Sequence, residues 1–363
     1  MGKLKILWYN WKDIKNPEAG GAEVFTYEVA KRWVKNGHTV TLFSSQYKNC
    51  KKEEFMDGIK IIRSGGKYTI YLKAKEYYQK YFRKEGYDII IDEINTRPFF
   101  VQKFNLKGET VVALIHQLAK EYWFYETPFP INFIGYYFLE KRWLKNYENV
   151  STITVSNSTK KDLINLGFKK VYVVGEGLNF SPLKDLQQKE SYPVIVYVGR
   201  LKKAKRPDHA IKAFKIVKKI IPSAQLWIIG NGYLENKLKN IACEGVKFFS
   251  QLSNEERRNL ISKSWVLVNP SIREGFGLNI IEANALGVPC IGYDVPGLRD
   301  SIINEETGFL VQSGNIEILA QKIVQLLTDN NLRIMLSKKA LAYSKKFSWD
   351  DVAKKFMNIL VGV

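Results

Sequence analysis

The sequence contains few of the residues that build disulfide frameworks and metal centres. Among its 363 residues are three cysteines and three histidines. Cys50, Cys243 and Cys290 are an odd number at wide spacing, which fits neither a disulfide framework nor a cysteine-rich zinc site. Three histidines are too few for a histidine-rich metal centre. The scarcity of both residue types favours a chain without a metal, in a reducing compartment such as the cytoplasm.

Long apolar runs are also lacking. The most apolar longer stretch covers residues 129–139 and is interrupted by Asn132, so it is about half as long as a membrane-spanning helix. Before Asn10 there are only four consecutive apolar residues, too few for the core of a signal peptide. Ile6 stands where a myristoylation site needs Ser or Thr. We therefore expect no segment that crosses a membrane.

Acidic residues are outnumbered by basic ones. There are 56 Lys and Arg against 36 Asp and Glu, a formal charge of +20, which indicates an anionic partner such as nucleic acid, anionic lipid or a phosphorylated small molecule. Residues 1–190 contain 31 basic and 21 acidic residues, and residues 191–363 contain 25 and 15, so each part carries +10. This even spread argues against a basic nucleic-acid-binding arm.

The pattern of apolar residues predicts two α/β domains. Residues 4–9 are an apolar run, residues 22–33 have helical spacing, and residues 40–43 are apolar again, which makes a βαβ unit. The polar stretch at residues 179–193 predicts a domain boundary, after which the pattern restarts. Further strands are expected at residues 88–91, 111–115, 153–155, 194–198, 226–229, 246–249, 265–268 and 288–291. Two such domains create a cleft, which is a common place for a ligand.

The sharpest motif follows the expected strand at residues 265–268 and opens a helix. It reads Arg-Glu-Gly-Phe-Gly-Leu-Asn-Ile-Ile-Glu-Ala over residues 273–283. Its glycines let the backbone approach a ligand, and the first amides of a helix can bind a diphosphate. Glu274 and Glu282 lie about two helical turns apart and can reach different parts of one ligand. The spacing fits equally well a Glu274 that caps the helix and a Glu282 that lies at the surface.

Three other segments also follow predicted strands. Gly20-Gly21 opens a helix after the first strand, at the sheet edge where α/β proteins bind ligands. Arg200 and Lys205 belong to a run of five cations within residues 200–206, where Arg grips a phosphate with a planar fork and Lys adds a point charge. A solvated charge run accounts for the other cations. His116 follows the strand at residues 111–115, and only this position separates it from a structural histidine.

In their combined order these segments resemble the retaining glycosyltransferases of family 4. The resemblance rests on Gly20-Gly21-Ala22-Glu23, His116, Ser156-Asn157-Ser158-Thr159 before Asp162-Leu163, Gly199-Arg200-Leu201 with Lys205, Gly230-Asn231-Gly232, Glu274 with Glu282, and Ser348-Trp349. It covers nearly the whole chain. It implies a GT-B fold, in which two Rossmann-like domains face a central cleft. Residues 1–182 are then the acceptor-side domain, residues 192–347 bind the nucleotide sugar, and residues 348–363 are a helix that returns to the first domain.

The resemblance also implies roles for individual residues. Arg200 and Lys205 hold the donor's diphosphate, Glu282 binds the ribose hydroxyls, Glu274 faces the transferred sugar, and His116 contacts that sugar's hydroxyl or the reacting centre. Together with Arg200, Lys205 and Glu282, the donor-binding set comprises Gly20, Gly21, Gly232, Leu252, Phe276, Gly277, Leu278 and Asn279, with Leu252 beside the base. His116, Glu274, Arg200 and Lys205 form the catalytic set.

The implied activity is transfer of a hexose such as glucose or mannose, with retention of configuration, from a UDP- or GDP-sugar to a hydroxyl of a glycan or lipid-linked acceptor. No metal is expected, and the sequence contains no Asp-x-Asp triplet. A GT-B epimerase or phosphorylase stays open as an alternative, and so does a basic nucleic-acid-binding protein.

Aromatic and basic residues alternate at 67–84, and aromatics recur at 122–143. Two interpretations fit this pattern: contact with anionic lipid at the inner face of the cell membrane, or packing of these aromatics inside the protein.

Two features are left without a firm role. Glu176 departs from the Asn-Gly-Val-Asp sequence that many family members have at this point, because this chain reads Gly175-Glu176-Gly177-Leu178-Asn179. Asp92 and Glu93 end a predicted strand and are either an acceptor-side carboxylate pair or ordinary helix caps, with capping preferred.

Overall fold

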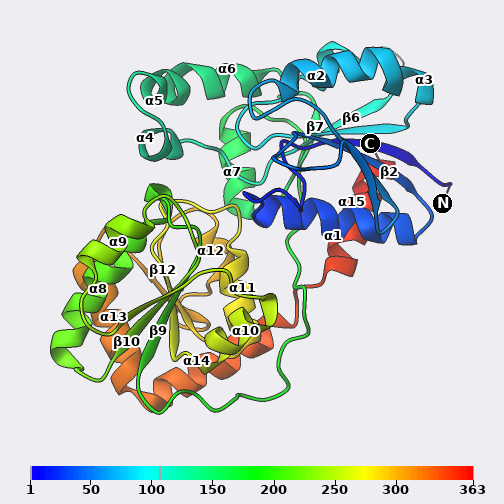
Figure 1. Ribbon diagram of the computed structural model, residues 1–363. Coiled ribbons are helices and arrows are strands. Elements are labelled where there is room, and N and C mark those ends of the chain that lie inside the picture. The colour runs from blue at the N-terminus through cyan, green and yellow to red at the C-terminus, as the bar shows by residue number, and fades with distance from the viewer. Residues whose placement is uncertain (1, 106–107, 363) are drawn as a thin grey trace. The chain divides into compact units, whose positions relative to one another are not determined.

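The computed structural model describes residues 2–105 and 108–362, and its internal contacts divide the chain into two compact units (Figure 1). Unit 1 comprises Met1–Lys120, Phe133–Gly177 and Ser348–Val363, and unit 2 comprises Glu121–Asn132 and Leu178–Phe347. Sequence order alone placed residues 121–132 in the first domain. Their contacts are with the second unit, which only tertiary packing decides.

Unit 1 is built on an eight-stranded sheet. Its strand order is β3 (Glu53–Met56), β4 (Ile59–Arg63), β2 (Thr39–Ser44), β1 (Lys5–Tyr9), β5 (Ile89–Glu93), β6 (Thr110–Leu114), β7 (Ser151–Thr154) and β8 (Val171–Val173). All neighbours pair in parallel except β3 and β4. Ile6 to Tyr9 of β1 are fully buried, as expected for a central strand covered on both faces.

Helices cover this sheet, and the last of them packs on the first. The helical segments of unit 1 are α1 (Gly21–Lys35), α2 (Ile70–Tyr77), the π-helical η1 (Tyr78–Phe82), α3 (Arg83–Glu85), the 3-10 helix η2 (Val101–Lys103), the π-helical η3 (Gly135–Leu139), α6 (Glu140–Lys145), α7 (Asn157–Asn165) and α15 (Trp349–Val361), while α5 (Ile131–Ile134) begins in unit 2 and ends in unit 1. In Figure 1 the red α15 lies beside the blue α1. Trp33 donates its indole N–H to the Ala353 carbonyl at 2.9 Å, and its ring lies 5.0 Å from that of Phe356.

Unit 2 is a six-stranded parallel sheet with its own core. Its order is β11 (Val246–Phe249), β10 (Gln225–Ile229), β9 (Val194–Val198), β12 (Val266–Asn269), β13 (Cys290–Tyr293) and β14 (Gly308–Val311). Its helical segments are α4 (Tyr122–Glu126), the 3-10 helix η4 (Lys203–Lys205), α8 (Pro207–Ile220), α9 (Glu235–Ile241), α10 (Asn254–Lys263), α11 (Leu278–Ala285), α12 (Leu298–Ser301), α13 (Ile316–Thr328) and α14 (Asn330–Ser344). The chain order reverses between β9 and β12, and the carboxyl ends beside such a reversal are where open α/β sheets bind ligands.

Within the two described stretches, no helix combines the length and the apolar character that crossing a membrane requires.

Candidate functional site

The cation cluster of unit 2 lies in the loop between β9 and α8. This loop packs directly on the loop after β10, where two positions are glycine because the close approach of the backbones leaves no room for a side chain. A Cβ at Gly230 would lie 2.1 Å from the Gly199 carbonyl oxygen, and a Cβ at Gly232 would lie 2.5 Å from that of Leu201. The predicted glycine motif therefore has a structural function: it fixes the path of the backbone that leads into η4.

Lys205 and Glu274 form an ion pair at the carboxyl edge of the unit 2 sheet. Lys205 Nζ lies 2.5 Å from Glu274 Oε2, and Ser271 Oγ donates to Glu274 Oε1 at 2.8 Å. The two side chains are 18% and 14% exposed. They come from the loops after the adjacent strands β9 and β12, so the sheet brings together two residues that lie far apart in the sequence. Glu274 contacts a cation and a hydroxyl and does not cap α11.

The charge of Lys205 is held by its neighbours. Burial acts to lower the pKa of this ammonium, but the carboxylate of Glu274 and the hydroxyl of Tyr122 outweigh burial, and the pKa of Lys205 lies above its ordinary value. The side chain is therefore cationic throughout the neutral range. A partly buried, permanently charged ammonium at a sheet edge is suited to binding an anionic group.

The second motif places the start of α11 at the same edge. Gly277 precedes the helix with φ of 100°, a conformation that favours glycine, and a Cβ there would lie 2.9 Å from Ser301 Oγ. Asn279 donates to the Val198 carbonyl at 2.8 Å and accepts from Asn269 at 3.3 Å. These bonds tie the helix start to the ends of β9 and β12, so the Asn279 side chain positions the helix amides.

The other predicted donor-binding residues of unit 2 have varied environments. Glu282 accepts from Arg257 at 2.9 Å and is 14% exposed, so it is not an unpaired surface residue. Phe276 is buried, with its ring 5.6 Å from that of Phe347. Leu252 packs half-buried on the unit 2 core. The Arg200 side chain is half-buried, and its carbonyl accepts from the Lys202 amide at 2.9 Å. Their roles in binding stay predictions.

Helix α4 is a part of this site that sequence reasoning missed. Both carboxylate oxygens of Glu126 are used: Oε1 accepts from the Ala204 amide and Oε2 accepts from the Tyr233 hydroxyl, each at 2.9 Å. Ala204 is the middle residue of η4, next to Lys205. Glu126 therefore joins the loops after β9 and β10 to a helix that comes from much earlier in the chain.

The first residues of the same helix reach the loop after β12. Tyr122 donates its hydroxyl to the Arg273 carbonyl at 3.2 Å, and its ring centroid lies 5.8 Å from Lys205 Nζ. Glu121, which precedes α4, accepts from Arg273 Nε at 2.9 Å. One short segment thus contacts each loop that contributes to the Lys205–Glu274 pair. The recurrence of aromatics at residues 122–143 was the sequence signal for it.

His116 lies at the carboxyl edge of the unit 1 sheet between two carboxyl groups. Its Nε2 is 3.2 Å from Glu93 Oε1, and its Nδ1 is 3.9 Å from Glu176 Oε1. Glu93 ends β5, and Glu176 follows β8, so both come from strand ends of this sheet. The rings of His116 and Phe25 meet in a T-shaped arrangement with their centroids 5.0 Å apart, and the His116 carbonyl accepts from Thr159 Oγ1 at 3.0 Å.

Charge and burial oppose one another in this group. Burial lowers the pKa of His116, but the hydrogen bond and charge of Glu93, with smaller effects of Glu176 and Glu23, raise it above its ordinary value. Burial raises the pKa of Glu93, partly offset by His116 and Thr26. Burial also raises the pKa of Glu176 to about 8, despite the opposing charge of His116. The imidazole is therefore held as a cation.

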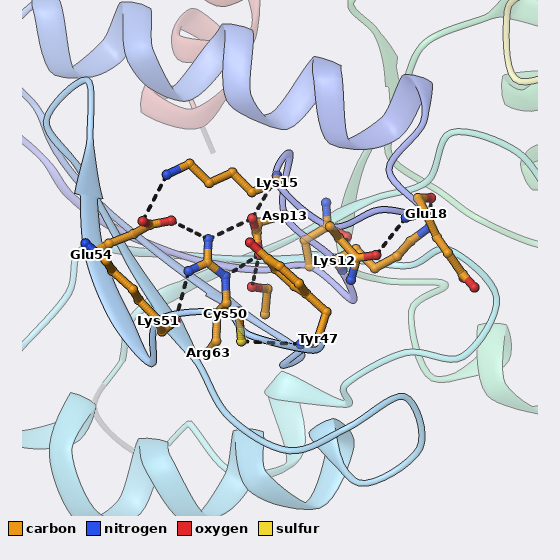
Figure 2. A network of polar contacts seen from close by, with 12 residues as sticks. Lys12, Asp13, Lys15, Glu18, Tyr47, Cys50, Lys51, Glu54 and Arg63 are labelled. Carbon is orange, nitrogen blue, oxygen red and sulfur yellow. Dashed lines mark hydrogen bonds and ion pairs between the residues drawn. The ribbon is translucent and has the colours of Figure 1, made fainter. Parts of the chain in front are cut away.

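The loop that leads to Gly20 is fixed by a buried ion pair (Figure 2). Arg63 of β4 donates to both oxygens of Asp13, at 2.6 and 2.9 Å, and to Glu54 at 2.7 Å. The Arg63 and Asp13 side chains are fully buried. Asp13 also accepts from Ser44 Oγ at 3.0 Å. Because breaking a buried pair leaves an uncompensated charge, this contact fixes the start of the loop between β1 and α1.

The glycine pair itself lies at the start of α1. Gly20 precedes the helix and donates its amide to Glu23 Oε2 at 2.6 Å, while Gly21 is the exposed first residue of α1. Lys12 Nζ is 3.6 Å from Glu23 Oε1. Unit 1 therefore gathers the predicted Gly20, Gly21 and His116 at one sheet edge, and Glu23 links the two parts electrostatically.

Asp92 and Glu93 differ in role although they are neighbours. Asp92 accepts from the amides of Phe99 and Val101, at the start of η2, which agrees with the preferred capping role. Glu93 caps no helix: it accepts from Trp8 Nε1 at 2.8 Å and lies against His116, so the capping prediction is wrong for this residue. Over residues 2–105 and 108–362, no three His, Cys, Asp or Glu side chains are grouped so as to hold a metal ion.

Two family models match the chain. The one described as Glycosyltransferase Family 4 matches residues 19–181, and the one described as Glycosyl transferases group 1 matches residues 182–342. The chain belongs to the family 4 type of glycosyltransferases. An uncharacterized glycosyltransferase of Methanocaldococcus jannaschii is 29% identical to it over 241 residues, which are 60% of this chain and 61% of that protein.

Solved structures show that this chain has the GT-B fold. Sucrose-phosphate synthase from Thermosynechococcus elongatus matches it with a TM-score of 0.80 at 22% identity over 98% of both chains. An Anabaena protein in complex with UDP and glucose matches with a TM-score of 0.72 at 15% identity, covering 99% of this chain and 100% of that one. In sequence, the match spans 61%, 24%, 46% and 42% of the length of four curated relatives, which is less than two thirds in each case.

Proposed function

We propose that this protein transfers a hexose from a UDP- or GDP-sugar to a hydroxyl of a glycan or lipid-linked acceptor, with retention of configuration. The observation that supports this most is the Lys205–Glu274 pair, at 2.5 Å, on adjacent strand-end loops of unit 2. A cation and a carboxylate side by side suit a diphosphate and a sugar respectively. The solved complex of the Anabaena protein with UDP and glucose supports a nucleotide-sugar donor.

In the proposed reaction the bond between the sugar's anomeric carbon and the diphosphate oxygen breaks, and the electron pair goes to the diphosphate. Lys205, Arg200 and the amides at the start of α11 stabilise this growing negative charge, which is the largest contribution that a site of this kind makes. The acceptor oxygen forms the new bond on the same face of the sugar. Its proton goes to the departing phosphate oxygen, so charge and atoms balance without a separate base.

We assign charge neutralisation to these side chains and amides, and no metal ion is part of the proposed mechanism. Glu274 would hold hydroxyls of the transferred sugar once the diphosphate binds Lys205. Glu282 would bind the ribose. Gly232 and Leu252 would line the nucleotide part of the site.

Replacement of Lys205 tests the proposal. A screen of UDP- and GDP-sugars for thermal stabilisation first identifies the donor, because a ligand that binds only the folded state raises the melting temperature. With that donor, Lys205→Met should reduce kcat by about 100-fold or more, the usual cost of losing one transition-state contact. Lys203→Met, an exposed cation two residues earlier, is the matched control. Lys205→Met activity equal to that of the control would contradict the proposal.

We further propose that unit 1 contacts an anionic membrane at the cytoplasmic face. Exposed pairs recur every four residues from α5 through η3 into α6: Phe133 and Ile134, Tyr137 and Phe138, then Lys141 and Arg142. Phe138 is 61% exposed. An apolar stretch that continues into a cationic one suits an interface between acyl chains and anionic head groups. The stretch at residues 67–84 contributes less to the membrane contact, because two of its aromatics, Tyr78 and Phe82, are buried. Tyr68 in the same stretch is exposed.

Vesicle sedimentation tests this contact. The wild type should pellet with vesicles that contain anionic lipid and not with neutral ones, and less so at high salt, which screens the attraction. Phe138→Ser should reduce the bound fraction, whereas Phe55→Ser, a 68% exposed residue on β3, should not. No pelleting of the wild type with anionic vesicles would rule the contact out.

A further inference from the structure

The two carboxyl groups beside His116 are not equivalent. Glu93 is fully buried, yet its oxygens receive hydrogen bonds from Trp8 Nε1 at 2.8 Å and Thr26 Oγ1 at 2.5 Å, in addition to the contact with His116 at 3.2 Å. A buried carboxylate with several donors is compensated and stays charged. Glu93 is therefore the fixed anion that balances the imidazolium.

Glu176 has no such compensation. It is 5% exposed, and across the two described stretches its Oε2 has no hydrogen-bond partner. Its other oxygen is 3.9 Å from His116 Nδ1, which is beyond hydrogen-bond distance. The free energy needed to bury a second carboxylate without donors would exceed its attraction to the imidazolium, because that cation is already paired with Glu93. The state of Glu176 with the lower free energy is the neutral acid, in which one oxygen carries a proton.

The backbone at Glu176 is fixed. A Cβ on the next residue, Gly177, would lie 2.5 Å from both the Trp349 backbone nitrogen and its ring, so the chain passes directly under the start of α15. Trp349 is 1% exposed and packs on Phe25, the residue whose ring meets His116. Because the backbone next to Glu176 and the imidazole both pack on this aromatic cluster, the position of Glu176 beside His116 is a fixed feature of this sheet edge.

In the part of the chain that the structure describes, few other charged groups face this cluster. Glu93 on β5 and Glu23 on α1 act on the imidazole, and Lys12 from the loop after β1 pairs with Glu23. Lys12 and Glu23 balance each other, as do His116 and Glu93. This leaves Glu176 as the remaining acid of the group, and a neutral Glu176 makes the whole cluster electrically neutral.

We propose that Glu176 is a substrate-binding residue that works as a neutral carboxylic acid: beside the His116–Glu93 ion pair, it donates its Oε2–H to the oxygen of an uncharged sugar hydroxyl. A sugar hydroxyl brings no charge into the buried cluster, which a neutral acid accommodates and an anion does not. The proposal deepens the proposed function, on which its kinetic consequences rest. The hydroxyl belongs to the transferred sugar or to the sugar acceptor.

The protonation state is testable without any activity. Because the chain contains three histidines, the ¹⁵N resonances of His116 can be assigned with His38→Gln and His209→Gln variants. Both ring nitrogens of His116 should be protonated at pH 7, and their shifts should report a titration near pH 8, where the pKa of Glu176 lies. Glu176→Gln should abolish that titration. Glu109→Gln, which alters a buried carboxyl bound to Tyr78 in the same unit, should leave it in place. A titration that survives in Glu176→Gln, or is missing from the wild type, overturns the proposal.

The kinetic test separates binding from a structural role. The wild-type kcat/KM should fall about tenfold per pH unit above pH 8, as expected when one essential proton is lost. Glu176→Gln retains a neutral donor, so its profile should stay level there, within about fivefold of the wild type at pH 7. Glu176→Ala should be reduced about tenfold or more at every pH, the usual range for one lost hydrogen bond. If wild type and Glu176→Gln fall together, the proposal is wrong.

The KM that rises in Glu176→Ala identifies the source of the hydroxyl. A rise in the donor KM assigns it to the transferred sugar, and a rise in the acceptor KM assigns it to the acceptor; a loss in kcat alone contradicts binding of either. Absence of transfer with every nucleotide sugar would contradict the proposed function instead. The ¹⁵N titration would still decide for or against the neutral carboxyl in that case.

Discussion

Glu93 is a buried carboxylate that accepts hydrogen bonds from Trp8 and Thr26 and contacts His116, so its charge is important for stability. Glu93→Gln would turn an amide NH₂ toward Trp8, Thr26 or His116, all of which donate to this position. We expect a loss of about 2–4 kcal/mol in the free energy of unfolding, because buried donors lose their acceptor. Urea unfolding measures it. Glu53→Gln, whose side chain is 54% exposed, should stay within about 0.5 kcal/mol of the wild type. Equal stability of the two variants would refute the assigned role.

At this scale the sequence identified side chains but not their partners. Lys205, Glu274 and His116 each follow a predicted strand, and the parallel sheet indeed brings Lys205 and Glu274 together at 2.5 Å. Strand-end position also pointed to Glu93, although its role was assigned wrongly. Glu176 could not be interpreted, because its meaning depends on a missing hydrogen-bond donor and on burial, and neither is visible in a single sequence.

Helix α4 shows how an element can belong to one unit by sequence order and to another by contact. Glu126→Ala removes the acceptor of the Ala204 amide and of the Tyr233 hydroxyl. We expect the amides of η4 to exchange with deuterium about 10- to 100-fold faster, the equivalent of about 1–3 kcal/mol for an unsatisfied buried group. Exchange mass spectrometry of residues 199–206 measures the change. Phe124→Leu, on the same helix and 45% exposed, should leave it unaltered. Unchanged exchange in Glu126→Ala would show that α4 does not hold η4.

Buried parallel strands were the elements that the sequence predicted best. Residues 194–198 coincide with β9, because a strand that is buried on both faces is an uninterrupted apolar run. Residues 246–249 coincide with β11, although this edge strand is only half-buried and includes the exposed Lys247. The β3–β4 hairpin was missed, since β3 alternates between exposed and half-buried residues and includes the exposed Phe55. The π-helical turns η1 and η3 were missed as well. Both lie within continuous helical segments, and periodicity does not reveal one extra residue in a turn.

The even distribution of the +20 charge over the sequence agrees with two units that each have their own sheet and core. The polar stretch at residues 179–193 forms no helix and no strand, as its composition indicated. It is nevertheless hydrogen-bonded to the rest of unit 2. The Glu190 carbonyl accepts from Trp265 Nε1 at 3.0 Å, and Lys189 Nζ donates to the carbonyls of Ser262 at 2.8 Å and Gly287 at 3.2 Å. The half-buried Lys189 therefore connects this stretch to the rest of unit 2 and makes the stability of the protein sensitive to pH.

Burial, with a smaller effect of the Arg333 charge, lowers the pKa of Lys189 to about 7. In the unfolded chain this lysine titrates near its ordinary value of about 10.4, so between these two pH values the unfolded state binds more protons than the folded state. The contribution of Lys189 to stability therefore rises with pH above 7, by at most about 1.4 kcal/mol per pH unit. Lys189→Met lacks this term. Between pH 7 and pH 9, urea unfolding should show the wild type gaining about 1–2.5 kcal/mol relative to the variant. Lys184→Met, an exposed lysine of the same linker, should follow the wild type at both pH values. The other titrating groups are common to wild type and variant, so their contributions cancel in the difference between the two stabilities. Parallel pH profiles for wild type and Lys189→Met would mean that this lysine remains charged in the folded protein.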